Sequence, residues 1–225
     1  MTSAAAASAL DGFHPLIPQS LLEAIRNLDT PLDDGLTDLA GEVTAKRLGL
    51  SHTVTHQIER YQESSARRQL VPVEEVILVF RLVGRRPDAA LVYADAGRRA
   101  ARYAVRAAGP GPRLLLRVLP GPVRRRLGGP AAARVARRLL RIGLELGQGR
   151  AVEHGGGGEG ASARVSDSLA SLAGYPGTGC AFYGAALAEL LRVTSGFEGA
   201  MVHEQCRGRG DPSCAWRAAE PGGYE

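Results

Sequence analysis

Apolar residues recur every three to four positions through most of the first two thirds of the chain, which is the period of an amphipathic α-helix. This pattern predicts helices over residues 18–28, 36–48, 52–68, 73–83, 88–107 and 131–146, with proline and glycine between them. In the last third, shorter apolar runs predict strands over residues 150–153, 163–166, 197–205 and 215–219. One further helix is expected over residues 181–193, which Gly196 can end in a left-handed conformation. The glycine-rich residues 154–160 then form a hairpin tip or a linker.

This order of elements predicts an α+β fold, in which a helical N-terminal half packs on a small antiparallel sheet built from the C-terminal segments. A ligand in such an arrangement would lie between the helices and the concave face of the sheet. The chain has 225 residues, 44% of them hydrophobic, which is enough to bury a core. No apolar run reaches the length of a membrane span, and the alanine-rich start lacks the basic region of a signal peptide, so we expect a cytoplasmic protein.

The net charge of +5 comes from arginine, because Lys46 is the only lysine among 28 basic residues. The arginines gather in two stretches: Arg98, Arg99, Arg102 and Arg106, then Arg124, Arg125, Arg126, Arg134, Arg137, Arg138 and Arg141. Solvated helix faces account for most such clusters. The alternative is that some guanidiniums bind the carboxylates of a ligand, or anionic headgroups at a membrane surface. Nucleic acid is not an expected partner, because aromatic residues make up only 5% of the chain and do not alternate with the arginines.

All three cysteines, Cys180, Cys206 and Cys214, fall in the last quarter of the chain. The last two bracket the polar turn Arg-Gly-Arg-Gly-Asp-Pro-Ser, whose glycines and proline favour a hairpin that folds one cysteine back toward the other. Their odd number argues against a disulfide framework. Three converging thiolates indicate a structural zinc site, and the alternative is three reduced cysteines packed as small hydrophobic residues.

A closed tetrahedral zinc site needs a fourth ligand, and His203 and Glu204 both stand shortly before Cys206. Regular strand alternation places Glu204 on the same face as Cys206 and His203 on the other face. A β-bulge would reverse this arrangement, and structural zinc sites prefer histidine to carboxylate. The sequence therefore leaves both residues as candidates.

The turn between the last two cysteines carries the pattern Cys-x-x-x-Gly-Asp-Pro-x-Cys, present as Cys206, Gly210, Asp211, Pro212 and Cys214. In this turn, and across residues 179–216, the chain resembles the 4-vinyl reductase domain. Some members of that family sense aromatic compounds in bacterial transcription activators and bind zinc through three cysteines and an acidic residue. The resemblance implies zinc at Cys180, Cys206 and Cys214, with His203 at the position of the acid.

Residues 91–103 and the arginine-rich segments after them are similar to the branch of this family that serves bacteriochlorophyll biosynthesis, so the resemblance covers about residues 71–216. It implies a ligand-binding domain over residues 71–219, with the cysteine motif at 179–216, and a helical N-terminal extension over residues 1–70. The implied fold is akin to haem-nitric-oxide-binding and vesicle-tethering domains, a kinship that also suggests a homodimer.

The resemblance implies that the chain binds a tetrapyrrole intermediate, such as a divinyl protochlorophyllide, and presents it to the enzymes of bacteriochlorophyll synthesis. The family name implies a 4-vinyl reductase. The sequence, however, carries neither a dinucleotide-binding motif nor four cysteines for an iron–sulfur cluster, which argues against an autonomous reductase. The alternative function is a module that senses a smaller aromatic compound or a lipid and acts on a regulatory partner.

Six side chains within the segments that carry the resemblance are candidates to hold a planar ligand: Tyr93, Arg98, Arg99, Tyr103, Phe182 and Tyr183. Aromatic rings stack on a macrocycle, and guanidiniums pair with its propionates. An aromatic residue at helical spacing more often fills the core, which is the alternative for each of the four rings.

Overall fold

The computed structural model describes residues 12–30, 50–109, 120–140, 143–146, 161–166 and 168–219. Over these residues the chain is of the α+β class, as predicted, with an antiparallel sheet in the order β1-β2-β4-β3. The strands are β1 (Gly143–Leu146), β2 (Ala161–Val165), β3 (Ala200–Gln205) and β4 (Cys214–Ala219). The last three overlap the strands predicted over residues 163–166, 197–205 and 215–219.

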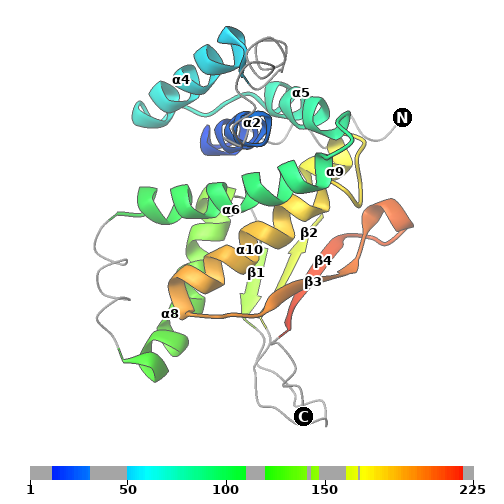
Figure 1. Ribbon diagram of the computed structural model, residues 1–225. Helices are drawn as coiled ribbons and strands as arrows, with labels where there is room; N and C mark the ends of the chain where they lie inside the picture. The colour runs from blue at the N-terminus through cyan, green and yellow to red at the C-terminus, as the bar shows by residue number, and fades with distance from the viewer. Residues whose placement is uncertain are drawn as a thin grey trace, which may run out of the picture.

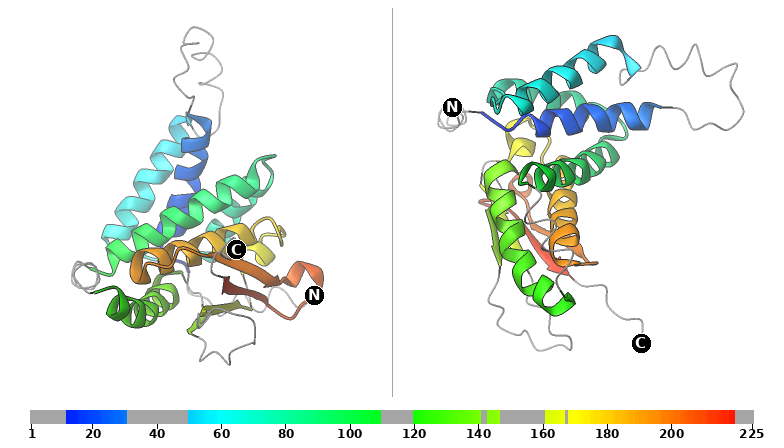
Figure 2. Two further views of the ribbon diagram at one scale, coloured as in Figure 1. Left: turned by 60° about the horizontal axis from the view of Figure 1, so that its bottom comes forward. Right: turned by 90° about the vertical axis from the view of Figure 1, so that its left-hand side faces the viewer.

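The helices form layers next to this sheet (Figure 1). α10 (Cys180–Ser195) lies across the sheet, α6 (Ala89–Ala107) packs on α10, and α2 (Leu16–Asp29) packs on α6. α4 (His52–Ala66) and α5 (Val73–Gly84) pack on α2, and the short α9 (Leu169–Leu172) contacts α5. Figure 2 shows the same stacking from another side, with α2 and α4 far from the sheet. Within the described ranges, none of the helices has the length and apolar character needed to cross a bilayer.

The helices predicted over residues 18–28, 52–68, 73–83, 88–107 and 181–193 are confirmed, as α2, α4, α5, α6 and α10. Ser51 caps α4, because its side chain accepts a hydrogen bond from the N–H of Val54. Gly196 ends α10 with a φ of 76°, as predicted. The predicted helix over residues 36–48, the predicted strand over 150–153 and the glycine-rich segment 154–160 lie outside the described residues.

The helix predicted over residues 131–146 is wrong at both ends. α8 (Gly121–Val135) begins earlier and continues as a π-helical turn, η2 (Ala136–Leu140). Gly128 lets α8 approach α10 closely, since a Cβ there would lie 2.5 Å from a carbonyl oxygen of α10. Packing against α10 therefore stabilises α8 although it contains Gly128, Gly129 and Pro130, which have low helix propensity. Residues 143–146 form β1 instead, because they pair with β2.

One hydrophobic cluster runs from α2 to the sheet. Residues on both sides of the predicted boundary at residue 70 contribute to it, and Phe13 and Val71 form an isolated antiparallel bridge across that boundary. α6 and α10 approach closely at Gly97, where a Cβ would lie 2.2 Å from the carbonyl oxygen of Phe182. This contact positions the start of α10, which carries the first cysteine.

An ion-pair network also ties α10 to α6. Glu189 of α10 is 5% exposed and accepts hydrogen bonds of 2.7 Å from Arg102 of α6 and from Arg192. The guanidinium of Arg192, together with that of Arg102, lowers the pKa of Glu189, although burial acts in the opposite direction. A buried carboxylate thus stays ionised because two arginines neutralise it.

Candidate metal centre

Three cysteines and a histidine converge where α10 meets the β3–β4 hairpin. Cys180 opens α10, His203 lies in β3, Cys206 follows β3 and Cys214 begins β4. Their ligand atoms all lie within 4.8 Å of one another, and all three cysteines are buried and free of disulfides. Figure 1 shows the start of α10 close to α9 and the hairpin. The cluster therefore lies at the junction of the helical layers and the sheet.

The spacing of the sulfur atoms fits a tetrahedral zinc ion. The Sγ atoms of Cys180 and Cys214 are 3.7 Å apart. Two thiolates in a tetrahedral shell with Zn–S distances of about 2.3 Å stand about 3.8 Å from each other. The fold alone thus holds these two sulfurs at the separation that zinc requires.

A β-bulge in β3 separates the two candidate fourth ligands. The register of β3 against β4 shifts between His203 and Gln205, so that Glu204 is an extra residue in the strand. The extra residue brings His203 to the same face as Cys206. Glu204 points away, and its exposed carboxylate accepts a hydrogen bond of 2.5 Å from Nε of Arg217. The structure thus corrects the expectation from regular alternation that Glu204 would be a ligand.

The imidazole of His203 stacks on the indole of Trp216, with ring centroids 4.8 Å apart and an angle of 13° between the planes. Its Nε2 is buried and has no hydrogen-bond partner among the described residues. Burial lowers the pKa of His203, and the charge of Arg209 acts in the same direction, so the ring is neutral at pH 7. A buried nitrogen without a partner is costly, and a metal ion would satisfy it.

Asp211 fixes the turn that holds the central cysteine. Its Oδ2 accepts a hydrogen bond of 2.6 Å from the backbone N–H of Cys206, and its own N–H donates to the carbonyl oxygen of Cys206 at 3.3 Å. Gly210 has a φ of 95° and ends the short helix η3 (Arg207–Arg209) in the left-handed region. The Gly-Asp pair of the motif therefore shapes the loop around one ligand.

Backbone donors favour the thiolate form at part of the cluster. Burial raises the pKa of Cys180, so without a metal this residue keeps its proton at pH 7. Burial also opposes ionisation of Cys206, but the backbone N–H of Gly208 and further donors outweigh it and lower the pKa of Cys206. The backbone N–H of Arg207 donates to Sγ of Cys214 at 3.5 Å. Thiolate is the form that binds zinc, so these donors favour metal binding.

The aromatic residues predicted to hold a planar ligand pack against one another in the core. Tyr93 stacks on Phe80 with ring centroids 4.5 Å apart, and its hydroxyl donates to the carbonyl oxygen of Phe80 at 2.7 Å. Phe182 packs edge-on against Phe80 and Tyr183, and the hydroxyl of Tyr183 accepts a hydrogen bond of 2.7 Å from the N–H of Leu169. The three predicted residues are at most 3% exposed. These three side chains fill the core, which is the alternative to ligand binding that the sequence predicts for them.

Tyr103, Arg98 and Arg99 also have partners within the protein. The hydroxyl of Tyr103 donates to the carboxylate of Glu23, which joins α6 to α2. Nε of Arg99 lies 2.7 Å from the carboxylate of Asp95, and Arg98 lies 3.9 Å from the same group. The six residues predicted to hold a ligand therefore do not line one common site.

A cavity away from these six residues lies between the C-terminal ends of α4 and α6 and the helix formed by α8 and η2. Its lining includes His14, Arg68, Arg134 and Arg138. The last two belong to the second arginine cluster of the sequence, and their like charges at i and i+4 are the signal that marks them. His14 and Arg68 carry no such signal, because only tertiary packing brings their segments together.

Comparison of the chain with protein-family models, with curated proteins and with solved structures gives no match. The fold and the site define an α+β protein with a candidate zinc centre of three cysteines and one histidine. The resemblance to the 4-vinyl reductase domain stays a prediction from the motif residues.

Proposed function

We propose that this chain is a zinc-braced domain of the 4-vinyl reductase type, which binds a tetrapyrrole intermediate of bacteriochlorophyll synthesis and delivers it to the enzymes of that pathway. The observation that carries the proposal is the cluster of three cysteines and one histidine, because the cysteines that form it are those of the motif on which the resemblance rests. A fold akin to haem-nitric-oxide-binding domains is part of the same proposal.

Four protein ligands suit a structural zinc ion. Cys180, His203, Cys206 and Cys214 complete a tetrahedral shell, which leaves no coordination position for water or substrate. The metal would brace the junction of α10 with the hairpin, and its binding free energy would add to the stability of the folded state. We infer that the chain acts by binding its ligand, since the sequence also shows no dinucleotide-binding motif.

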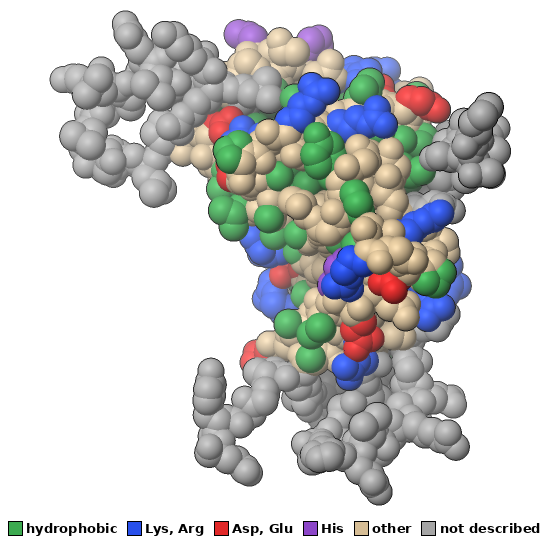
Figure 3. Space-filling view, turned by 90° about the vertical axis from the view of Figure 1, so that its right-hand side faces the viewer, with side chains coloured by type: hydrophobic (Ala, Val, Ile, Leu, Met, Phe, Trp, Pro, Cys, Tyr) green, Lys and Arg blue, Asp and Glu red, His purple; other side chains and the backbone are tan. Residues whose placement is uncertain are grey.

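The surface charge on one face of the molecule gives no support to a nucleic-acid ligand. On the face shown in Figure 3, basic and acidic side chains are interspersed and do not merge into one basic patch. Several arginines pair with carboxylates, as Arg86 does with Asp29 at 2.7 Å and Arg60 does with Glu75. A basic patch or stripe is the usual footprint of nucleic-acid binding, and this face does not show one. Contact with a membrane surface and formation of a homodimer stay predictions of the sequence.

A second candidate function is the sensing of a smaller aromatic compound or a lipid on behalf of a regulatory partner. The set of metal ligands favours this second function, because His203, the proposed fourth metal ligand, lies three positions before the central cysteine, Cys206. That spacing is the one the resemblance assigns to the family members that sense aromatic compounds.

Titration of the full zinc-loaded chain with divinyl protochlorophyllide, followed by absorbance, tests the proposed function. We expect a saturable spectral shift, and no loss of the vinyl group when NADPH is added. Phenol is the probe for the sensing function, with binding measured by calorimetry. Binding of phenol without any shift for the tetrapyrrole would favour sensing. Reduction of the vinyl group by NADPH in the presence of the chain, with no other enzyme, would overturn delivery as its role.

A further inference from the structure

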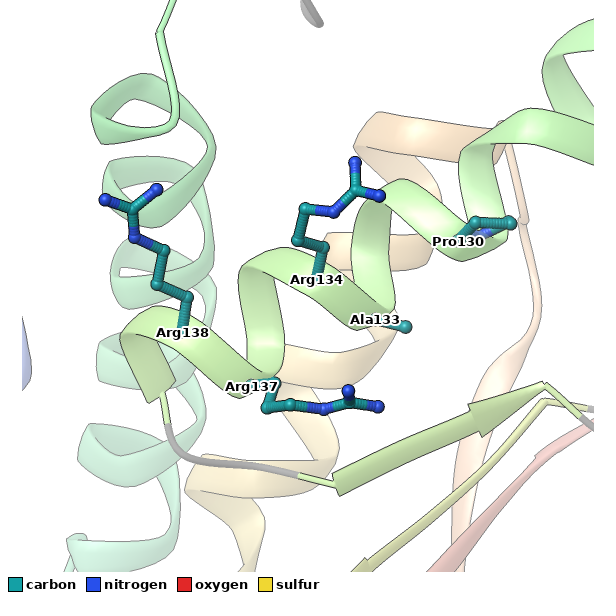
Figure 4. A pocket seen from close by; sticks show the side chains of 5 residues that line it. All are labelled: Pro130, Ala133, Arg134, Arg137 and Arg138. Carbon is teal, nitrogen blue, oxygen red and sulfur yellow. The ribbon is translucent and has the colours of Figure 1, made fainter.

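A cavity of about 720 Å³ lies between the C-terminal ends of α4 and α6 and the helix formed by α8 and η2. Its volume is in the range of sites that hold small molecules. Its wall combines apolar and basic side chains: Leu70, Val135 and Leu139 with His14, Arg68, Arg134 and Arg138. A smaller hollow of about 390 Å³, shown in Figure 4, adjoins it and shares Arg134 and Arg138.

Among the described residues, the lining of this cavity contains three arginines and no acidic residue. Several arginines elsewhere in the protein pair with carboxylates, as Arg102 does with the buried Glu189. Within the part of the chain that the structure describes, no carboxylate pairs with Arg68, Arg134 or Arg138. Three positive charges therefore face one cavity without a counter-ion from these residues.

Arg68 reaches the cavity through an unusual backbone conformation. Its φ of 57° is the only positive value among the described residues other than glycine. It follows the last turn of α4, where its N–H donates to the carbonyl oxygen of Ser65 and the N–H of Gln69 donates to that of Ser64. Glycine is the usual residue at such a position, because a side chain is disfavoured there. The chain instead places a guanidinium at the cavity at a cost in backbone free energy.

The facing wall carries a second irregularity. Two lining residues, Arg138 and Leu139, belong to the π-helical turn η2. Turns of this kind are rare in proteins, and those that occur are often found at functional sites. Arg134 and Arg138 extend to the same side of the helix, whereas Arg137 extends to the other side (Figure 4). Like charges one turn apart destabilise a helix, and an anion bound between them would remove that repulsion.

We propose that this cavity binds the carboxylate of an apolar molecule, with the carboxylate held by Arg134 and Arg138 and the apolar body against Leu70, Val135 and Leu139. A guanidinium offers paired N–H donors whose geometry matches a carboxylate. The propionate of a tetrapyrrole is one source of this chemistry, and to that extent the inference rests on the proposed function. A fatty acid is a second source that does not depend on it.

Two pairs of probes test the site on the full zinc-loaded chain. Protoporphyrin IX and oleate carry carboxylates, whereas protoporphyrin IX dimethyl ester and methyl oleate lack them. The double variant Arg134→Gln/Arg138→Gln removes both guanidiniums, and Arg137→Gln, on the other side of the same helix, is the matched control. All three arginines are exposed, so we expect every variant to fold, which circular dichroism and zinc content check.

We expect a carboxylate probe to bind at least about tenfold more tightly than its ester, and to lose at least about tenfold in affinity in the double variant but not in Arg137→Gln. Binding of oleate that depends on these arginines, without binding of protoporphyrin IX, would support the cavity and refute the tetrapyrrole ligand. Protoporphyrin IX that binds equally as acid, as ester and to the double variant would support the ligand class and overturn this site. No binding of either carboxylate probe would also overturn it.

Discussion

The carboxylate of Asp211 accepts a hydrogen bond of 2.6 Å from the backbone N–H of Cys206. The aspartate of the motif is thus tied to the central cysteine of the cluster and holds its backbone in place. A residue that orients a metal ligand affects metal affinity without touching the metal.

Asp211→Ala removes this acceptor. We expect zinc affinity to fall by about 10- to 100-fold, the usual effect of losing a group that orients a ligand, as measured by competition with a chelating dye. Asp211→Asn is the control, because its amide oxygen can still accept the bond, and we expect it to remain closer to the wild type. An Asp211→Ala protein with unchanged zinc affinity would show that other contacts hold Cys206.

Substitutions at His203 test the fourth ligand. We expect His203→Ala to lower zinc affinity by at least about tenfold, and His203→Asp to keep more of it because a carboxylate also binds zinc. Cobalt in place of zinc reports the ligand set through its visible absorption. Glu204→Ala is the control, since its carboxylate pairs with Arg217 on the other side of the strand. Loss of metal in Glu204→Ala alone would reverse the assignment.

The sequence predicts the cysteines of this site but not the whole ligand set. Cys180, Cys206 and Cys214 converge in the structure as the motif and the hairpin signals indicate. The resemblance points to the position of His203, but strand geometry alone could not choose between His203 and Glu204. Regular alternation favours Glu204, and the bulge that reverses this arises from pairing with β4.

The site proposed for the small molecule is harder to predict from the sequence than the metal ligands are. The spacing of Tyr93 and Phe182 fits a binding site and a core equally well, and their burial decides for the core. The cavity joins Arg68, in a left-handed conformation, to Arg138, in a π-helical turn. Neither conformation has a local sequence signature, because an arginine stands where a glycine usually ends a helix and because η2 follows α8 without a break. The helix predicted over residues 131–146 is wrong at its C-terminal end because residues 143–146 pair with β2.

Gly97→Ala tests the close packing of α6 on α10. Because the new Cβ would lie 2.2 Å from the carbonyl oxygen of Phe182, the helices must move apart. We expect the free energy of unfolding in urea to fall by about 1–3 kcal/mol.

Gly184→Ala is the matched control on α10, since its Cβ would meet Trp216 at 3.4 Å and fit. There we expect no loss, and a gain of up to about 1 kcal/mol from helix propensity. Equal destabilisation by both substitutions would contradict the difference in packing.

Glu189→Gln tests the network between α6 and α10. Arg192 and Arg102 lower the pKa of Glu189 in the folded protein, so its carboxylate stabilises the fold above the ordinary pKa of 4.5 and loses this effect as the pH falls below it. We expect Glu189→Gln to lower the free energy of unfolding by about 1–3 kcal/mol at neutral pH and by less in acid.

Urea unfolding of the variant and the wild type at each pH gives this difference. Zinc leaves both proteins in acid, so the difference between them is the quantity to compare. Glu63→Gln is the control, because Glu63 forms only an exposed pair with Arg67 at 3.6 Å, and such pairs contribute little. A variant that stays equally destabilised in acid would contradict the role of the charge.

The measurement that tests the metal centre most directly is the zinc content of the full chain, purified without added metal and determined by elemental analysis. We expect about one zinc per chain, and loss of that zinc in Cys214→Ser. A folded protein that contains no zinc and takes none up at neutral pH would contradict the metal centre on which the proposed function rests.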